Sequence, residues 1–93
     1  MEQHKLTDLA AITDAKLDLA HFAKYFGYLR VSVSMWVNNR ALPHPWRHAQ
    51  LCRDLELVRT AMKSGLLPVK VSARRAKYDA MCRALDAARQ LVQ

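Results

Sequence analysis

The sequence predicts an all-α fold, a compact bundle of about five helices. Its 93 residues include only two glycines and three prolines, too few for the many turns of a β fold. Apolar residues make up 52% of the chain and charged residues 25%, which is a globular composition. Apolar side chains recur at intervals of three and four along most of the chain, as on one face of a helix. We therefore expect a single domain over residues 1–93, which can bury a core without metal or disulfide.

The first half of the chain is expected to form three helices. A short amphipathic segment spans roughly residues 3–14. Asp18 is expected to cap a second helix over residues 19–26, because an aspartate side chain accepts a hydrogen bond from the first helical turn. Gly27 should end that helix, since glycine adopts a left-handed conformation without steric cost. A third helix should begin at residue 29 or 30 and reach about residue 38.

Two longer helices are expected in the second half. Pro45 can open the first of them, because the missing N–H of proline costs nothing in a first turn. The apolar stripe of this helix, which ends before Gly65, consists of Leu51, Leu55, Val58 and Met62. Ser72 is expected to cap a final amphipathic helix with an apolar seam at Tyr78, Met81, Leu85, Ala88 and Val92. This helical extension, residues 69–93, either mediates dimerisation through its seam or covers the chain's own core.

The net charge of +7 is concentrated in two stretches that contain no acid. The bases of the first stretch, residues 19–53, are Lys24, Arg30, Arg40, Arg47 and Arg53. Those of the second stretch, residues 63–77, are Lys63, Lys70, Arg74, Arg75 and Lys77. Solvated helices usually mix both signs of charge, so two acid-free stretches indicate a polyanionic partner. The alternative is a basic surface that serves only solubility.

The sequence contains no pattern typical of an enzyme, a metal site or a membrane protein. It has no nucleophile–base pair, carboxylate pair or phosphate-binding glycine loop, so we expect no catalysis, no cofactor and no small-molecule substrate. Cys52 and Cys82 are interpreted as reduced, buried thiols. His44 and His48 lie four residues apart with no third ligand nearby, so no metal is expected. The absence of a signal peptide pattern and of a long apolar run predicts a cytoplasmic location and no membrane partner.

Residues 19–38 fit a helix-turn-helix unit with Gly27 as the glycine of the turn. Ala23 then stands where the two helices cross closely and a small side chain is needed. Val33 and Trp36 stand where the second helix is anchored to the first. The aromatic residues that line the crossing are Phe22, Phe26 and Tyr28. Every constrained position of the unit is filled by an acceptable residue, and the basic composition of this stretch suits the motif.

At these residues the chain resembles the Cro/repressor family of phage and prophage transcriptional regulators. Some Cro-like members have a second motif helix that reads serine-x-valine-serine-x-tryptophan-x-asparagine-glycine-arginine, which is similar to VSVSMWVNNR at residues 31–40. The resemblance covers roughly residues 19–45. Leu29 stands where a hydroxyl residue commonly caps the recognition helix, which leaves the start of that helix open. Asn39 replaces a glycine, and asparagine is tolerated there because it visits the left-handed region.

The resemblance implies sequence-specific binding of double-stranded DNA, with the helix around residues 30–38 in the major groove. The residues expected to contact bases are Arg30, Val31, Ser34 and Met35, whose side chains suit guanine, thymine methyl groups and mixed donor–acceptor edges. The residues expected to contact phosphates are Ser32, Asn38, Asn39, Arg40, Arg74 and Arg75. A homodimer on a DNA operator is expected, acting in transcription regulation as a Cro-like protein or repressor.

A second hypothesis belongs to a different functional class. A small phage-encoded helical protein could use the same basic surface and C-terminal helix to bind a host protein, as an inhibitor or adaptor. The two hypotheses differ in their dependence on salt, because DNA binding that neutralises several phosphates weakens steeply as salt is added.

Overall fold

The structure, a computed structural model, describes residues 9–91, and it is all-helical as the sequence predicts. The helices are α1 (Ala10–Asp14), α2 (Leu19–Phe26), α3 (Arg30–Val37), α4 (Pro45–Lys63) and α5 (Arg74–Leu91). The segment predicted over residues 3–14 is confirmed as a helix at Ala10–Asp14, and residues 3–8 lie outside the described range.

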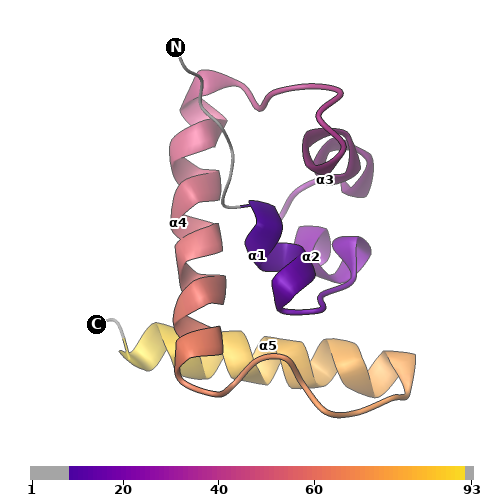
Figure 1. The fold of residues 1–93 in the computed structure, drawn as a ribbon, viewed down its shortest axis with the longest axis vertical. Helices are drawn as coiled ribbons and strands as arrows, with labels where there is room; N and C mark the ends of the chain where they lie inside the picture. The colour runs from indigo at the N-terminus through magenta and orange to yellow at the C-terminus, as the bar shows by residue number, and fades with distance from the viewer. Residues whose placement is uncertain (1–8, 92–93) are drawn as a thin grey trace.

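The two long helices enclose the three short ones on one side (Figure 1). α5 crosses the lower end of α4, and α1, α2 and α3 lie above α5 along one side of α4. α4 packs against α1 and α5, and α2 packs against α3. The largest fully buried side chains come from all five helices and are Ile12, Phe22, Val33, Leu51, Leu55, Val58, Met81 and Leu85. This arrangement leaves α3 on the side of the molecule away from α4.

Local sequence chemistry sets both ends of α2, and both predictions for it are confirmed. Asp18 is extended, and its Oδ1 accepts a hydrogen bond of 2.8 Å from the backbone N–H of Ala20. Gly27 is left-handed, with a φ of 83°, and its N–H donates to the carbonyl of Ala23 at 2.8 Å. A Cβ added to Gly27 would meet no atom within 4 Å, so the backbone conformation and not the space requires glycine here.

The start of α4 is as predicted, and the start of α5 is not. Pro45 is the first residue of α4, and the stripe on this helix is buried except at Met62, which is half-buried. α5 begins at Arg74, so the expectation that Ser72 caps it is wrong. The carbonyl of Ala73 accepts from the N–H of Lys77 at 2.8 Å, which places Ala73 in the capping position.

The apolar seam of α5 faces the chain's own core. Met81, Leu85 and Ala88 are buried in the core, and Tyr78 packs against it half-buried. Val92 lies outside the described residues. Of the two alternatives for the seam, the structure therefore supports the one in which it covers the chain's own core. A dimer would have to form through other side chains.

We expect Asp18→Ala to lower the free energy of unfolding by about 1 kcal/mol at neutral pH, because the change removes the acceptor for the Ala20 N–H. Burial acts to raise the pKa of Asp18, but that hydrogen bond and the charges of His21 and Arg74 outweigh it, so the pKa lies below its usual value of 3.8. A lowered native pKa stabilises the fold above the unfolded-state value, and this contribution is lost as pH falls through the native value.

The difference in the free energy of unfolding between the wild type and Asp18→Ala should therefore become smaller below about pH 4. Urea denaturation of both proteins at about pH 7 and about pH 3 measures this difference. Asp18→Asn retains a side-chain acceptor and serves as the control, expected within about 0.5 kcal/mol of the wild type at pH 7. Equal deficits of Asp18→Ala at both pH values would contradict the charged-cap account.

Candidate nucleic-acid interface

Four aromatic rings hold α3 against α2. The rings of Phe22 and Tyr28 are nearly parallel at 6.0 Å between centroids, and Phe22 also contacts Phe26 at 4.8 Å. Tyr28 meets Trp36 edge to face at 5.5 Å. Val33 is fully buried and only 7% of Trp36 is exposed. The inner face of α3 is thus fixed on α2 by the residues that the helix-turn-helix fit assigns to the crossing.

Tyr28 also connects the turn to α4. Its hydroxyl donates to Oδ2 of Asp54 at 2.5 Å, and the guanidinium of Arg47 lies 5.0 Å from the centre of its ring. Burial and the hydrogen bond to Asp54 raise the pKa of Tyr28, so its hydroxyl remains a donor at neutral pH. Burial also raises the pKa of Asp54, although the Tyr28 hydrogen bond and the charge of Arg89 act in the opposite direction. Asp54, the first acidic residue after the acid-free stretch 19–53, is therefore hydrogen-bonded within the fold.

The opposite face of α3 presents the four residues that the sequence assigns to base contacts. Arg30 and Val31 are exposed, with 60% of Val31 accessible. Met35 is 40% exposed, and Ser34 is half-buried. The structure brings a guanidinium, two apolar side chains and a hydroxyl together on one helix face, the combination that suits major-groove edges.

α3 begins at Arg30, which settles the helix start that the sequence leaves open. Leu29 precedes it in an extended conformation, and its side chain makes no capping hydrogen bond. The Leu29 side chain is instead exposed to solvent beside Arg30 and Val31. Leu29 is not among the residues expected to contact bases, because the position is usually a cap, so its exposure next to them is a finding of the structure.

The C-terminal end of α3 carries three residues expected to contact phosphates, and all three are exposed. The side-chain nitrogen of Asn38 donates to the carbonyl of Ser34 at 2.9 Å, so part of its donor capacity is used within the helix. Asn39 has a φ of 58°, the left-handed conformation that the sequence indicates asparagine can adopt here. The N–H of Arg40 then closes the turn on the carbonyl of Met35 at 2.8 Å. Ser32, in the first turn of α3, is half-buried.

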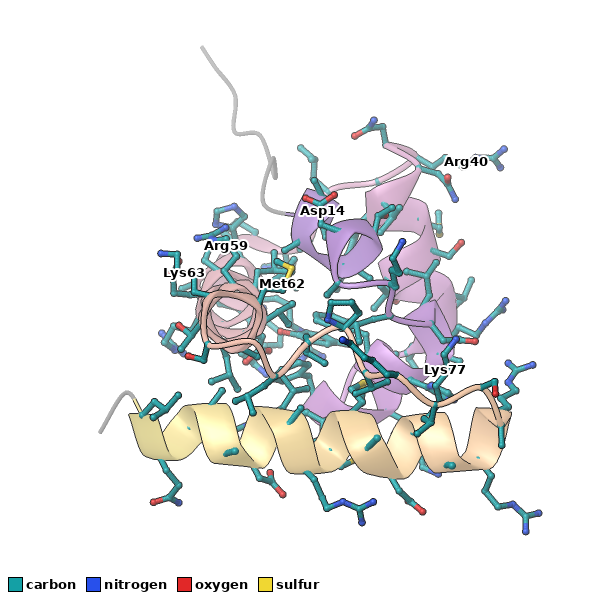
Figure 2. The ribbon with its side chains drawn as sticks, turned by 60° about the horizontal axis from the view of Figure 1, so that its bottom comes forward. Asp14, Arg40, Arg59, Met62, Lys63 and Lys77 are labelled. Atoms are coloured by element: carbon teal, nitrogen blue, oxygen red, sulfur yellow. The ribbon has the colours of Figure 1, made fainter. Side chains whose placement is uncertain are left out.

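The other two residues expected to contact phosphates lie apart from α3, in the first turn of α5. Arg74 pairs with Oδ2 of Asp18 at 3.2 Å, at the start of α2, and Arg75 is exposed next to it. In Figure 2, Arg40 lies at the end of the molecule far from α5. The structure therefore divides the expected phosphate contacts into a group at α3 and the turn that follows it, and a group at the start of α5.

Lys24 is a basic residue of the first acid-free stretch that is not among the expected phosphate contacts. Its ammonium lies 4.7 Å from the centre of the Tyr78 ring, across the contact between α2 and α5. Lys24 thereby joins Arg74 and Arg75 around one surface depression. Residues far apart in sequence create this grouping, and no local spacing could have revealed it.

Other kinds of site find little support in the described part of the chain. Among residues 9–91, no group of three or more histidine, cysteine or carboxylate side chains could hold a metal ion. Cys52 and Cys82 are free thiols, half-buried where the sequence interpretation had them buried. No helix within the described range is long and apolar enough to cross a membrane.

No protein-family model, curated protein or solved structure matches the chain. The likeness to the Cro/repressor family therefore rests on residues 19–45 and on the residue pattern quoted above. A function for the chain must be argued from the geometry of α2 and α3 and from the distribution of charge.

Proposed function

We propose that this chain is a sequence-specific double-stranded DNA-binding protein, a transcriptional regulator of the Cro or repressor type that acts in the cytoplasm. The observation that carries the proposal is the two-faced α3. Its inner face is buried on the aromatic residues of α2 and the turn, and its outer face exposes Arg30, Val31 and Met35. A recognition helix needs both faces, because it must be held rigidly by the rest of the domain and must present side chains to the groove.

In this proposal α3 lies in the major groove with its N-terminal half against the base edges. Arg30 donates two hydrogen bonds to O6 and N7 of a guanine, and Val31 and Met35 pack against thymine methyl groups. Ser34 bonds a donor or acceptor edge where the helix approaches the base pairs. Arg40 binds a phosphate and fixes the register without reading sequence.

The proposal includes a homodimer, because one recognition helix reads about one half-site and tight operator binding usually requires two. The seam of α5 is occupied by the chain's own core, so the two copies meet elsewhere. Bound at an operator, the dimer would regulate transcription by excluding or recruiting polymerase. No residue of the chain is assigned a catalytic role.

One observation favours the second candidate function, an inhibitor or adaptor that binds a host protein. Leu42, in the loop after α3, and Trp46, in the first turn of α4, are large apolar residues with exposed side chains, and 66% of Trp46 is accessible. A contiguous patch of exposed apolar side chains favours a protein partner. In the DNA-binding proposal that partner is the second copy of the chain, and in the alternative it is a host protein.

The dependence of duplex binding on salt separates the two candidates. We expect a mixed-sequence DNA duplex to bind with a logarithmic salt slope of about −4 or steeper, corresponding to four or more neutralised phosphates. Fluorescence anisotropy between about 50 and 200 mM salt measures this slope. Failure to bind any duplex at the lowest salt would reject the DNA-binding proposal and leave the protein-binding candidate.

A further inference from the structure

The fold brings together basic residues from the two acid-free stretches. The cation–π contact of Lys24 with Tyr78 fixes an α2 lysine over α5 at 4.7 Å. The depression at this contact is lined by His21, Lys24, Arg74, Arg75, Tyr78 and Asp79. We call Lys24, Arg74 and Arg75 the α2–α5 cluster. A cation–π contact uses no hydrogen-bond acceptor, so the Lys24 ammonium keeps its donors for another partner.

The fold also divides the second acid-free stretch between two surfaces. In Figure 2, Lys63 lies at the end of α4, on the other side of the molecule from Lys77, which lies near the first part of α5. The α2–α5 cluster is therefore a product of tertiary structure, and Lys63 provides a basic residue of the same stretch that does not belong to it.

The cations at the start of α5 are placed where the helix itself disfavours them. Its first turn holds Arg74, Arg75 and Lys77 and no acid. The positive end of the helix dipole disfavours a cation in this turn. Asp18 compensates Arg74 at 3.2 Å, but 76% of the Arg74 side chain remains exposed. Local rules are commonly broken in this way where a surface serves binding.

Two acids border the α2–α5 cluster and limit its charge. Asp18 is paired with Arg74, and Asp79 lines the depression. Lys24 and Arg75 are exposed and supply the remaining positive charge. The surface therefore suits an anionic ligand with single negative charges in a row, of which Lys24 and Arg75 can each contact one.

We propose that the α2–α5 cluster binds phosphates of the DNA strand that α2 crosses, outside the groove occupied by α3. This inference rests on the proposed function. In helix-turn-helix docking the second helix enters the groove and the first crosses the backbone. α2 lies between α3 and α5 in Figure 1, so a strand that α2 crosses continues toward the first turn of α5. The cluster would extend the DNA footprint beyond the half-site without adding sequence preference.

Two charge-matched double variants test the inference. Lys24→Gln with Arg75→Gln removes the two cations of the cluster other than Arg74, and Lys63→Gln with Arg83→Gln removes an exposed lysine and an exposed arginine elsewhere. We expect the first variant to flatten the logarithmic salt slope by about 0.9 for each phosphate contact removed, so by about 1.8 for each copy bound. Its affinity should fall by the same factor on an operator and on a scrambled duplex, and the control should keep the wild-type slope.

Thermal melts followed by circular dichroism show whether both variants are folded before binding is compared. Equal flattening in both variants would show that only net charge matters and would overturn the inference, as would an unchanged slope in the cluster variant. In either case Arg30-dependent recognition of the operator would still stand. A wild-type chain that binds no duplex would reject the proposed function itself. If the cluster variant lost binding to an acidic peptide that the wild type binds, and kept its binding to duplex DNA, the cluster would belong to a protein partner. That result would also overturn the inference.

Discussion

Trp36→Ala should lower the free energy of unfolding by about 3–5 kcal/mol, because it leaves a cavity where a large ring is packed. The indole is 7% exposed and meets Tyr28 edge to face at 5.5 Å. A domain of this size is stable by only about 5–15 kcal/mol, so the loss removes a large part of its stability. Urea denaturation of the variant and the wild type measures the difference.

Met35→Ala is the matched control, since Met35 is the preceding residue of the same helix and is 40% exposed. Its effect on stability should stay within about 0.5 kcal/mol. Trp36→Phe should fall between the two, because it retains an aromatic ring against Tyr28. DNA binding by Trp36→Ala should fail only under conditions in which the variant is unfolded. A deficit below about 1 kcal/mol for Trp36→Ala would contradict the assignment of Trp36 to the scaffold of α3.

Arg30→Ala should reduce affinity for the operator about ten- to hundredfold while leaving affinity for a scrambled duplex and the melting temperature nearly unchanged. Arg30 is exposed in the first turn of α3, so its removal opens no cavity. The bidentate pairing of an arginine with guanine contributes about 1–3 kcal/mol of discrimination between bases. Arg30→Lys should recover part of the loss, because a point charge cannot reproduce the planar fork.

Arg40→Ala provides the comparison for Arg30→Ala. Arg40 is exposed beyond the end of α3, and as a phosphate contact its loss should weaken binding to the operator and the scrambled duplex by the same factor. Anisotropy titrations on both duplexes at one salt concentration measure the two ratios. Equal losses on both duplexes for Arg30→Ala would make Arg30 a phosphate contact. No loss on either duplex would remove the basis for assigning α3 as the recognition helix.

Features that depend on local chemistry could be predicted from the sequence. Asp18, Gly27, Asn39 and Pro45 each act on the backbone within a few residues, and each has the conformation or position expected of it. The two faces of α3 could also be predicted, because helical spacing alone places Val31 and Met35 away from the buried Val33 and Trp36. The fold class follows from the same local signals.

Features that depend on distant contacts could not be predicted. The seam of α5 has a pattern that suits either a dimer or a core, and only the position of α4 and the short helices shows that it is buried within one chain. The error at Ser72 arose because a single good capping residue does not show where packing begins the helix. The contact of Lys24 with Tyr78 joins residues far apart in sequence, so no spacing encodes it.

Selection of bound sequences from a random duplex pool tests the central claim most directly. The account predicts a recovered palindromic motif, with half-sites about one helical turn apart and a guanine in each that Arg30 reads. Repeating the selection with Arg30→Ala should relax the preference for that guanine and leave the other positions of the motif in place. A pool that binds but shows no enriched motif, or no recovered duplex at all, would contradict sequence-specific recognition by α3.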